Sequence, residues 1–229
     1  SGKLYKLNAT TGAVEASADC SGVPPYFSYI AYGDGKIFVP QEVNGIVKVS
    51  AFNADTLALE WESGSVTLDA QALQSASPLN YYNGHVYFGT YAQDSNWQYA
   101  GGKFVCISAA DGSLIWQKES ATGYYWNGSA IVGDCIAVSD ISGTISTYSL
   151  ADGTEKGTIS AGANVNSTPC YADGILYVST KGGTIFSVPV DEHGVIDSAN
   201  VKQSANLGGA ISSSPVVYNG RLYVAGGGT

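Results

Sequence analysis

A short phrase that recurs five times along the chain constrains the fold more than any other feature. In each copy a tight turn of Asn-Gly, Asp-Gly or Gly-Asp is followed at once by a run of mostly apolar residues. The copies lie at Asp34–Val39, Asn83–Phe88, Gly133–Val138, Asp173–Val178 and Asn219–Val224. Asn-Gly and Asp-Gly pairs favour two-residue hairpin turns, because both residues tolerate a positive φ. Each copy therefore predicts a β-hairpin.

A second hairpin phrase alternates with the first. It runs from a Gly or Val through an alternating strand to a turn rich in Asp, Thr and Gly. Its copies lie at 2–12, 49–56, 102–112, 143–153 and 183–194. Two hairpins make a four-stranded unit, and a unit that repeats every 40–50 residues or so is typical of a β-propeller blade. We therefore expect an all-β propeller of four-stranded antiparallel blades, with residues 1–229 as a single domain.

The order of the hairpins predicts how the propeller closes. The chain begins with a copy of the second phrase and ends with a copy of the first, so it carries five of each. We expect the N-terminal and C-terminal hairpins to pair into one composite blade and to close a five-bladed ring, which would leave no exposed sheet edge. The alternative is that the chain is an arc of a seven- or eight-bladed ring.

Charge and hydropathy exclude two classes of partner. The formal net charge is −9 and Arg221 is the only arginine, so binding to nucleic acid is not expected. No apolar run approaches the roughly 18–20 residues that span a bilayer, so membrane insertion is not expected either. The chain lacks methionine and opens within a repeat. We interpret it as a piece excised from a larger secreted precursor that acts outside the cell or at the cell surface.

Four cysteines, at positions 20, 106, 135 and 170, have no regular spacing. Cys106, Cys135 and Cys170 fall on predicted strands, which favours buried thiols. The alternative is a single disulfide, for which Cys135 and Cys170 in neighbouring blades are the pair to test.

Two stretches resemble the repeat of pyrroloquinoline-quinone-like (PQQ-like) propellers. These are Gly-Lys-Leu-Tyr-Lys-Leu-Asn-Ala-Thr-Thr-Gly at 2–12 and Gly-Lys-Phe-Val-Cys-Ile-Ser-Ala-Ala-Asp-Gly-Ser-Leu-Ile-Trp at 102–116. The family pattern reads Gly-x-apolar-Tyr-Ala-Leu-Asp-x-x-Thr-Gly-x-x-x-Trp, and Trp61 and Trp116 match its closing tryptophan. The resemblance covers almost the whole chain and implies the fold. It does not imply one function, because such repeats occur in dehydrogenases, in outer-membrane assembly lipoproteins and in bacterial surface proteins. The repeats of this chain look most like those of the bacterial surface proteins.

Catalysis is not expected from these residues. The quinoprotein dehydrogenases that the resemblance implies have eight blades, and many carry an adjacent cysteine pair that is missing here. The sequence contains no Asp-x-Asp-x-Asp-Gly calcium loop. His85 and His193 both fall in turns, without the partners that a metal site or a Ser-His-Asp triad needs. We therefore expect no catalytic residue, no bound metal, and neither PQQ nor calcium as a cofactor.

Aromatic residues concentrate in three successive loops that we expect on one rim of the propeller. The first loop carries Tyr26 and Phe27. The second is an insertion at 91–101 that holds Trp97 and Tyr99 beside Asp94 and Asn96. The third carries Tyr124, Tyr125 and Trp126, followed by Asn127. These residues form the predicted binding site.

Aromatic rings beside amides and carboxylates suit two kinds of ligand. Sugars stack on the rings and bond to the polar edges, while proteins use Trp and Tyr as interface anchors. We therefore expect a non-catalytic recognition or scaffold module that binds a protein or a glycan. In the other interpretation of the third loop, residues 124–126 fill the channel or pack between blades. The alternative functions are a structural spacer without a ligand and a degenerate quinoprotein dehydrogenase-like domain.

Overall fold

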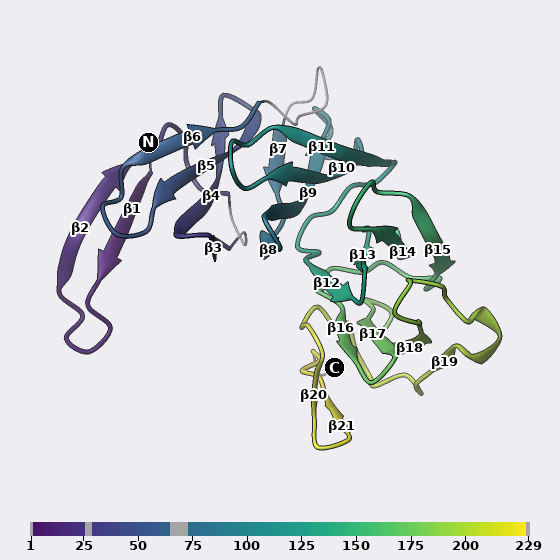
Figure 1. Ribbon diagram of the computed structural model, residues 1–229. Coiled ribbons are helices and arrows are strands. Elements are labelled where there is room, and N and C mark those ends of the chain that lie inside the picture. The colour runs from purple at the N-terminus through teal and green to yellow at the C-terminus, as the bar shows by residue number, and fades with distance from the viewer. Residues whose placement is uncertain (1, 26–28, 65–72, 228–229) are drawn as a thin grey trace. The chain divides into compact units, whose positions relative to one another are not determined.

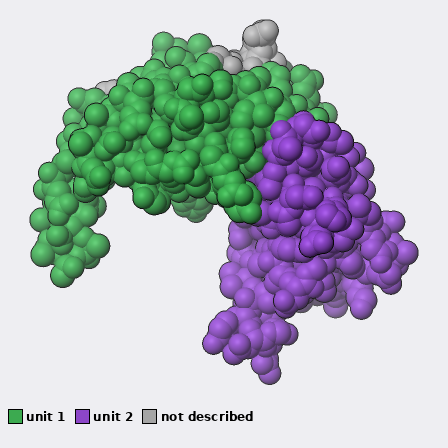
Figure 2. All heavy atoms as spheres, viewed as in Figure 1, with its two compact units in different colours: residues 1–121 green, residues 122–229 purple. Residues whose placement is uncertain are grey.

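The computed structural model describes residues 2–25, 29–64 and 73–227 (Figure 1). Within these ranges the chain is built from β-strands, with one short 3-10 helix, η1, at Ser198–Asn200. Contacts divide the chain into two compact units, unit 1 at residues 1–121 and unit 2 at residues 122–229 (Figure 2). That residues 1–229 form a single domain remains a prediction.

Unit 1 contains one half-blade and two full blades. The half-blade is a two-stranded sheet, β1 (Lys3–Leu7) and β2 (Val14–Asp19). The first full blade has the order β3 (Ala31–Gly33), β4 (Lys36–Val43), β5 (Ile46–Asn53) and β6 (Leu59–Glu62). In the second, β7 (Leu73–Ala76) and β8 (Asn80–Tyr82) both pair with β9 (His85–Gln93), followed by β10 (Gly102–Ser108) and β11 (Leu114–Ser120).

Unit 2 contains two full blades and one half-blade. The first blade has the order β12 (Ser129–Val132), β13 (Cys135–Ser139), β14 (Thr144–Ser149) and β15 (Glu155–Ser160). The second has the order β16 (Cys170–Ala172), β17 (Ile175–Ser179), β18 (Ile185–Pro189) and β19 (Lys202–Gln203). The half-blade is a two-stranded sheet, β20 (Val216–Tyr218) and β21 (Arg221–Tyr223). The predicted all-β propeller architecture of four-stranded blades is thus confirmed.

The turn chemistry that the sequence predicts is present in the structure. Asp34, Asn83, Asp173 and Asn219 have φ between 46° and 51°, and the glycine after each has φ between 66° and 79°. Two successive positive φ values are the mark of the type I′ turn, whose twist matches the strands on either side. In four of the five copies, such a turn connects the two strands of the first hairpin.

The pairing between the second and third strands of a blade has the same register in all four full blades. Lys36 lies opposite Asn53, His85 opposite Ser108, Cys135 opposite Ser149, and Ile175 opposite Pro189. These pairs occupy equivalent positions in the repeats. Because a slip of one residue would turn every side chain to the other face, the constant register keeps the apolar residues in the same layer of every blade.

The core consists of apolar blade faces stacked on one another. In unit 1, one cluster joins one face of β4 and β5 to the facing side of β9 and β10; it includes Phe38, Val47, Val49, Val86, Phe88, Val105 and Ile107. In unit 2, Ala137 and Ile145 of the first blade pack in the same way with Leu176, Val178 and Val188 of the second. Both faces of a central strand are therefore buried, which explains its nearly continuous apolar sequence.

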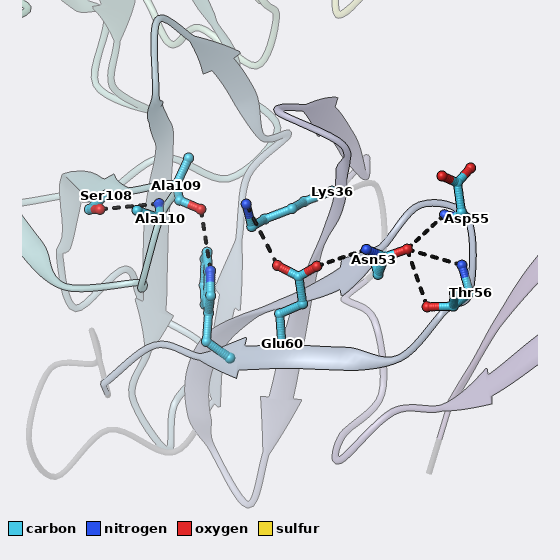
Figure 3. Close-up of polar contacts among 9 residues, drawn as sticks. Lys36, Asn53, Asp55, Thr56, Glu60, Ser108, Ala109 and Ala110 are labelled. Carbon is cyan, nitrogen blue, oxygen red and sulfur yellow. Dashed lines mark hydrogen bonds and ion pairs between the residues drawn. The ribbon is translucent and has the colours of Figure 1, made fainter.

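Polar side chains fasten the turns and join neighbouring blades (Figure 3). The Asn53 carboxamide oxygen accepts hydrogen bonds from the backbone N–H groups of Asp55 and Thr56, both at 3.1 Å. In unit 1 the Trp61 indole Nε1–H donates to the carbonyl oxygen of Ala109 in the next blade, at 3.3 Å. The closing tryptophan of the repeat thus links one blade to the turn of its neighbour.

The structure bears on two further expectations, the closure of the ring and the state of the cysteines. The N-terminal hairpin is a two-stranded sheet within unit 1 and the C-terminal hairpin is a two-stranded sheet within unit 2. Their pairing into a composite blade that closes a five-bladed ring remains a prediction. All four cysteines are free thiols in the described residues, including Cys135 and Cys170.

Candidate interaction surface

The insertion in unit 1 forms a compact turn organised by Asp94. Its carboxylate Oδ1 accepts hydrogen bonds from the backbone N–H groups of Asn96, at 2.8 Å, and Gln98, at 2.9 Å. The Gln93 side-chain amide donates to the carbonyl oxygen of Trp97 at 3.1 Å. The hydrogen bonds from Gln98 and then Asn96 lower the pKa of Asp94 below its ordinary value. The carboxylate of Asp94 therefore serves the turn itself.

Trp97 lies at the tip of this turn and projects into solvent. Its side chain is 71% exposed, and its φ of 63° lies in the left-handed region. A bulky residue rarely adopts this conformation, and such strain persists only when surrounding bonds impose it. Here the backbone N–H of Trp97 donates to the carbonyl oxygen of Asp94 at 3.0 Å. The turn therefore presents the indole ring of Trp97 to solvent, and the ring is not packed in a hydrophobic core.

Tyr99 extends this aromatic surface. It pairs with Gln93 through an isolated antiparallel bridge, and its side chain is 43% exposed. Trp97 and Tyr99 are thus two exposed rings on one short, hydrogen-bonded segment. We call Asp94, Asn96, Trp97 and Tyr99 the tip cluster, and all four were predicted site residues.

The third predicted loop lies in unit 2 and is mostly interior. Tyr124 is buried, and this burial raises the pKa of its hydroxyl group. The rings of Tyr125 and Trp126 stack at 4.8 Å between centroids, and both side chains are half-buried. These contacts correspond to the packing role that was the alternative interpretation of residues 124–126.

Asn127, which was also a predicted site residue, is interior. Its side chain is fully buried, and its Nδ2 donates to the carbonyl oxygen of Val165 at 2.9 Å and to the Ser139 hydroxyl at 3.4 Å. Val165 lies at the entry to the next blade, so Asn127 joins two neighbouring blades of unit 2. The sequence shows that Asn127 follows aromatic residues, but it does not show that the side chain of Asn127 points into the protein interior.

The structure brings the predicted residues together only in part. The tip cluster lies on one short segment of unit 1, and residues 124–127 form a second group within unit 2. Tyr26 and Phe27 lie outside the described residues. A common rim for all three loops remains a prediction.

A polar contact in unit 2 was missed from the sequence. The His193 ring Nδ1 lies 3.0 Å from the Asp134 carboxylate, and the Cys135 thiol donates to the same carboxylate at 3.2 Å. The hydrogen bond with Asp134 raises the pKa of His193, and the same bond lowers the pKa of Asp134. Asp134 and His193 belong to turns of neighbouring blades, so no spacing along the chain links them.

This contact does not assemble a nucleophile. Burial raises the pKa of the Cys135 thiol to about 12, so the thiol stays protonated near neutral pH. The thiol also bonds to the carboxylate rather than to the imidazole. Among the residues that the structure describes, no group of three or more His, Cys, Asp or Glu side chains is placed to hold a metal ion.

A depression in unit 2 contains none of the predicted site residues. It has a volume of about 370 Å³ and is lined by Gly174, Pro189, Val190, Asp191, Val195 and Asp197.

Across the described parts of the chain, no helix has the length and apolar character needed to cross a membrane.

Stacked four-stranded blades with a constant register define a β-propeller repeat protein. The family model described as outer membrane protein assembly factor BamB matches residues 1–128 and 102–229. The chain therefore belongs to this family of PQQ-like repeats, as its sequence predicted. No curated protein sequence matches the chain.

Solved structures share the fold at low sequence identity. A europium-containing methanol dehydrogenase matches with a TM-score of 0.66 and 12% identity, over 85% of this chain and 46% of its own. The quinohemoprotein alcohol dehydrogenase from Comamonas testosteroni matches with a TM-score of 0.65 and 14% identity, over 89% of this chain and 40% of its own. BamB from Moraxella catarrhalis matches with a TM-score of 0.49 and 15% identity, over 98% of this chain and 74% of its own. The chain thus spans less than half the length of either dehydrogenase.

Proposed function

We propose that this chain is a non-catalytic recognition module that binds a protein partner through the tip cluster. The observation that carries the proposal is the exposed indole of Trp97, held in a left-handed conformation by a turn that Asp94 organises. Tryptophan and tyrosine are the residues that most often dominate protein interfaces. A ring fixed before binding loses little conformational entropy when it is buried by a partner.

Two observations favour a protein over a glycan. The Asp94 Oδ1 already accepts hydrogen bonds from two backbone amides, and the Gln98 side-chain amide donates to the carbonyl oxygen of Asn96 at 3.3 Å. Fewer polar groups are therefore available to bond to sugar hydroxyls than the sequence suggested. The family description names an assembly factor, which is a protein that acts on other proteins.

The proposal extends to the place where the module acts. The family description names the outer membrane, and we infer that this chain also works outside the cytoplasm, in a secreted or surface-exposed protein. Fractionation of cells that produce the protein tests this location, and recovery with the cytoplasmic fraction would contradict it.

The function can be tested with a displayed random peptide library and a glycan array. Trp97→Asn removes the indole and keeps the turn, because asparagine tolerates a positive φ. Tyr32→Ala is the matched control, since Tyr32 is an exposed ring elsewhere in unit 1. We expect peptides that bind the wild type and lose at least about 30-fold in affinity with Trp97→Asn, the size of a hot spot, but not with Tyr32→Ala.

Other outcomes separate the alternatives. If selected peptides bind Trp97→Asn as well as the wild type, the tip cluster is not the interface. If neither the library nor the array yields a ligand, a structural spacer becomes the better account. Ring-dependent binding on the glycan array alone would replace the protein partner with a sugar. Saturable micromolar binding of PQQ in the presence of Ca²⁺ would favour a degenerate quinoprotein.

A further inference from the structure

The turn of the tip cluster uses most of its hydrogen-bond donors internally. The backbone N–H of Asp94 donates to the carbonyl oxygen of Gln98, and that of Trp97 donates to the carbonyl oxygen of Asp94, both at 3.0 Å. The backbone N–H groups of Asn96 and Gln98 donate to the Asp94 carboxylate. The side-chain amides of Gln93 and Gln98 donate to the carbonyl oxygens of Trp97 and Asn96. The turn therefore offers a partner a surface rich in acceptors, since each of these oxygens has a second lone pair.

Asp94 carries the strongest of these acceptors. Hydrogen bonds from Gln98 and then Asn96 hold the pKa of its carboxyl group below the ordinary value, so the group is ionised at neutral pH. Both backbone bonds to the carboxylate end on Oδ1, and Oδ2 takes no part in them. Asp94 is also the only charged residue in the insertion at 91–101. An ionised carboxylate in this setting favours a positively charged donor.

The same turn places an aromatic ring close to this carboxylate. The hydrogen bond from the Trp97 N–H to the Asp94 carbonyl oxygen closes a four-residue turn, in which the first and last Cα atoms lie within about 7 Å of each other. Trp97 and Tyr99 are both exposed, so their rings are accessible to a partner. The face of an aromatic ring attracts cations, and tryptophan attracts them most strongly. The turn thus combines a ring face with a negative charge.

A guanidinium group fits this combination better than an ammonium group. It is planar and stacks on an aromatic ring, and its fork of N–H groups bonds to a carboxylate at the same time. A lysine ammonium brings the positive charge without the planar face. The charge of the whole chain agrees with a cationic partner, because a formal net charge of −9 attracts basic segments and repels acidic or phosphorylated ones.

We propose that the protein segment bound by the tip cluster carries an arginine, whose guanidinium group stacks on the Trp97 indole and donates hydrogen bonds to the Asp94 carboxylate. This inference rests on the proposed function, because it names the partner chemistry of the same cluster. An exposed ring alone accepts many apolar side chains, whereas the ring and the carboxylate together select one residue type. The same carboxylate disfavours acidic segments, which adds a repulsive element to the selection.

The displayed random peptide library also tests the arginine. Among peptides that bind the wild type and depend on Trp97, we expect arginine to be enriched over its frequency in the unselected library. One such peptide is then synthesised in three forms, with arginine, with lysine, and with citrulline, which keeps the shape of arginine and removes its charge. The citrulline peptide should bind at least about tenfold more weakly than the arginine peptide, and the lysine peptide should lie between them.

Asp94→Asn tests the carboxylate, because asparagine keeps an oxygen acceptor for the amides of Asn96 and Gln98 and removes the charge. We expect this variant to bind the arginine peptide about tenfold more weakly than the wild type does. It should bind the citrulline peptide without further loss, since the charged pair is already absent. Hydrogen exchange at the two amides should match the wild type. Glu119→Gln removes an exposed carboxylate on β11 of the same unit and should bind the arginine peptide like the wild type.

Two kinds of failure are distinguishable. A citrulline peptide that binds as tightly as the arginine peptide, or no enrichment of arginine among Trp97-dependent peptides, would overturn the inference and leave the proposed function in place. An Asp94→Asn variant that binds the arginine peptide like the wild type would do the same. Peptides that bind without Trp97, or a selection that yields no peptide, would overturn both.

Discussion

At the scale of single residues, the tip cluster shows how a turn can hold an aromatic ring in solvent. Asp94 bonds to two backbone amides, and the strained φ of Trp97 is the result. We predict that Trp97→Asn leaves the free energy of unfolding unchanged or raises it by up to about 1 kcal/mol, because asparagine relieves the strain. Chemical denaturation measures this. A clear loss of stability would mean that the indole packs on the protein.

Asp94 should control the order of this turn. We predict that Asp94→Ala speeds hydrogen exchange at the amides of Asn96 and Gln98, because both lose their acceptor. The same amides in Trp97→Asn should keep their protection. If exchange is equally slow in Asp94→Ala, the turn is held by its backbone bonds alone.

The contact between His193 and Asp134 should respond to pH in a defined direction. The hydrogen bond raises the pKa of His193 above 6.5, so its stabilising effect is complete below pH 6.5 and is lost as pH rises through the raised pKa. The pKa of Asp134 is lowered below 3.8, so its effect is present above pH 3.8 and is lost in stronger acid. We predict that Asp134→Asn lowers the pKa of His193 in an NMR titration. An unchanged titration would contradict the contact.

The residues of the site were only partly predictable. The insertion was visible as a departure from the repeat, which is why its exposed aromatic residues Trp97 and Tyr99 were found. Packing of residues 124–126 in the interior was one of two interpretations, whereas burial of Asn127 was not predicted, because the inner strand decides which side chains turn inward. The partner of His193 lies 59 residues away in the neighbouring blade, and sequence separation hides such a contact.

At the scale of strands and turns, equivalent glycines provide a direct test of blade stacking. Gly12 and Gly112 have φ of 73° and 72° and occupy the same repeat position. A Cβ at Gly12 meets nothing within 4 Å, whereas one at Gly112 would lie 2.6 Å from the Trp61 ring. We predict that Gly12→Ala costs about 1 kcal/mol through its φ. Gly112→Ala should cost about 2 kcal/mol more through overpacking.

Urea denaturation of the two glycine variants measures the difference. Equal losses of stability would mean that Trp61 moves aside at little cost.

Strands and turns were the best predicted level of this protein, because the Asn-Gly and Asp-Gly turns leave little choice of hairpin. The composite blade remains a prediction, because joining the two end hairpins depends on packing between blades, which a repeat count does not contain.

At the scale of the whole molecule, stability should fall toward the two half-blades. In a repeat protein each unit is stabilised mainly by its direct neighbours, and a two-stranded sheet is weak by itself. We predict the fastest amide exchange in β1, β2, β20 and β21, and the slowest in β9, β10, β13 and β14, whose side chains are mostly buried. Hydrogen exchange measured by mass spectrometry resolves these segments. Uniform exchange along the chain would contradict nearest-neighbour stabilisation.

The unchanging register between the second and third strands has a consequence for how such a protein can vary in length. Since every full blade aligns its central strands at the same pair of positions, any blade can be joined to any other without altering the strand alignment inside either. A duplication or deletion of one complete repeat leaves each remaining hairpin intact. The number of blades can therefore change between descendants of one gene, while the sequences of the loops that connect the strands diverge independently.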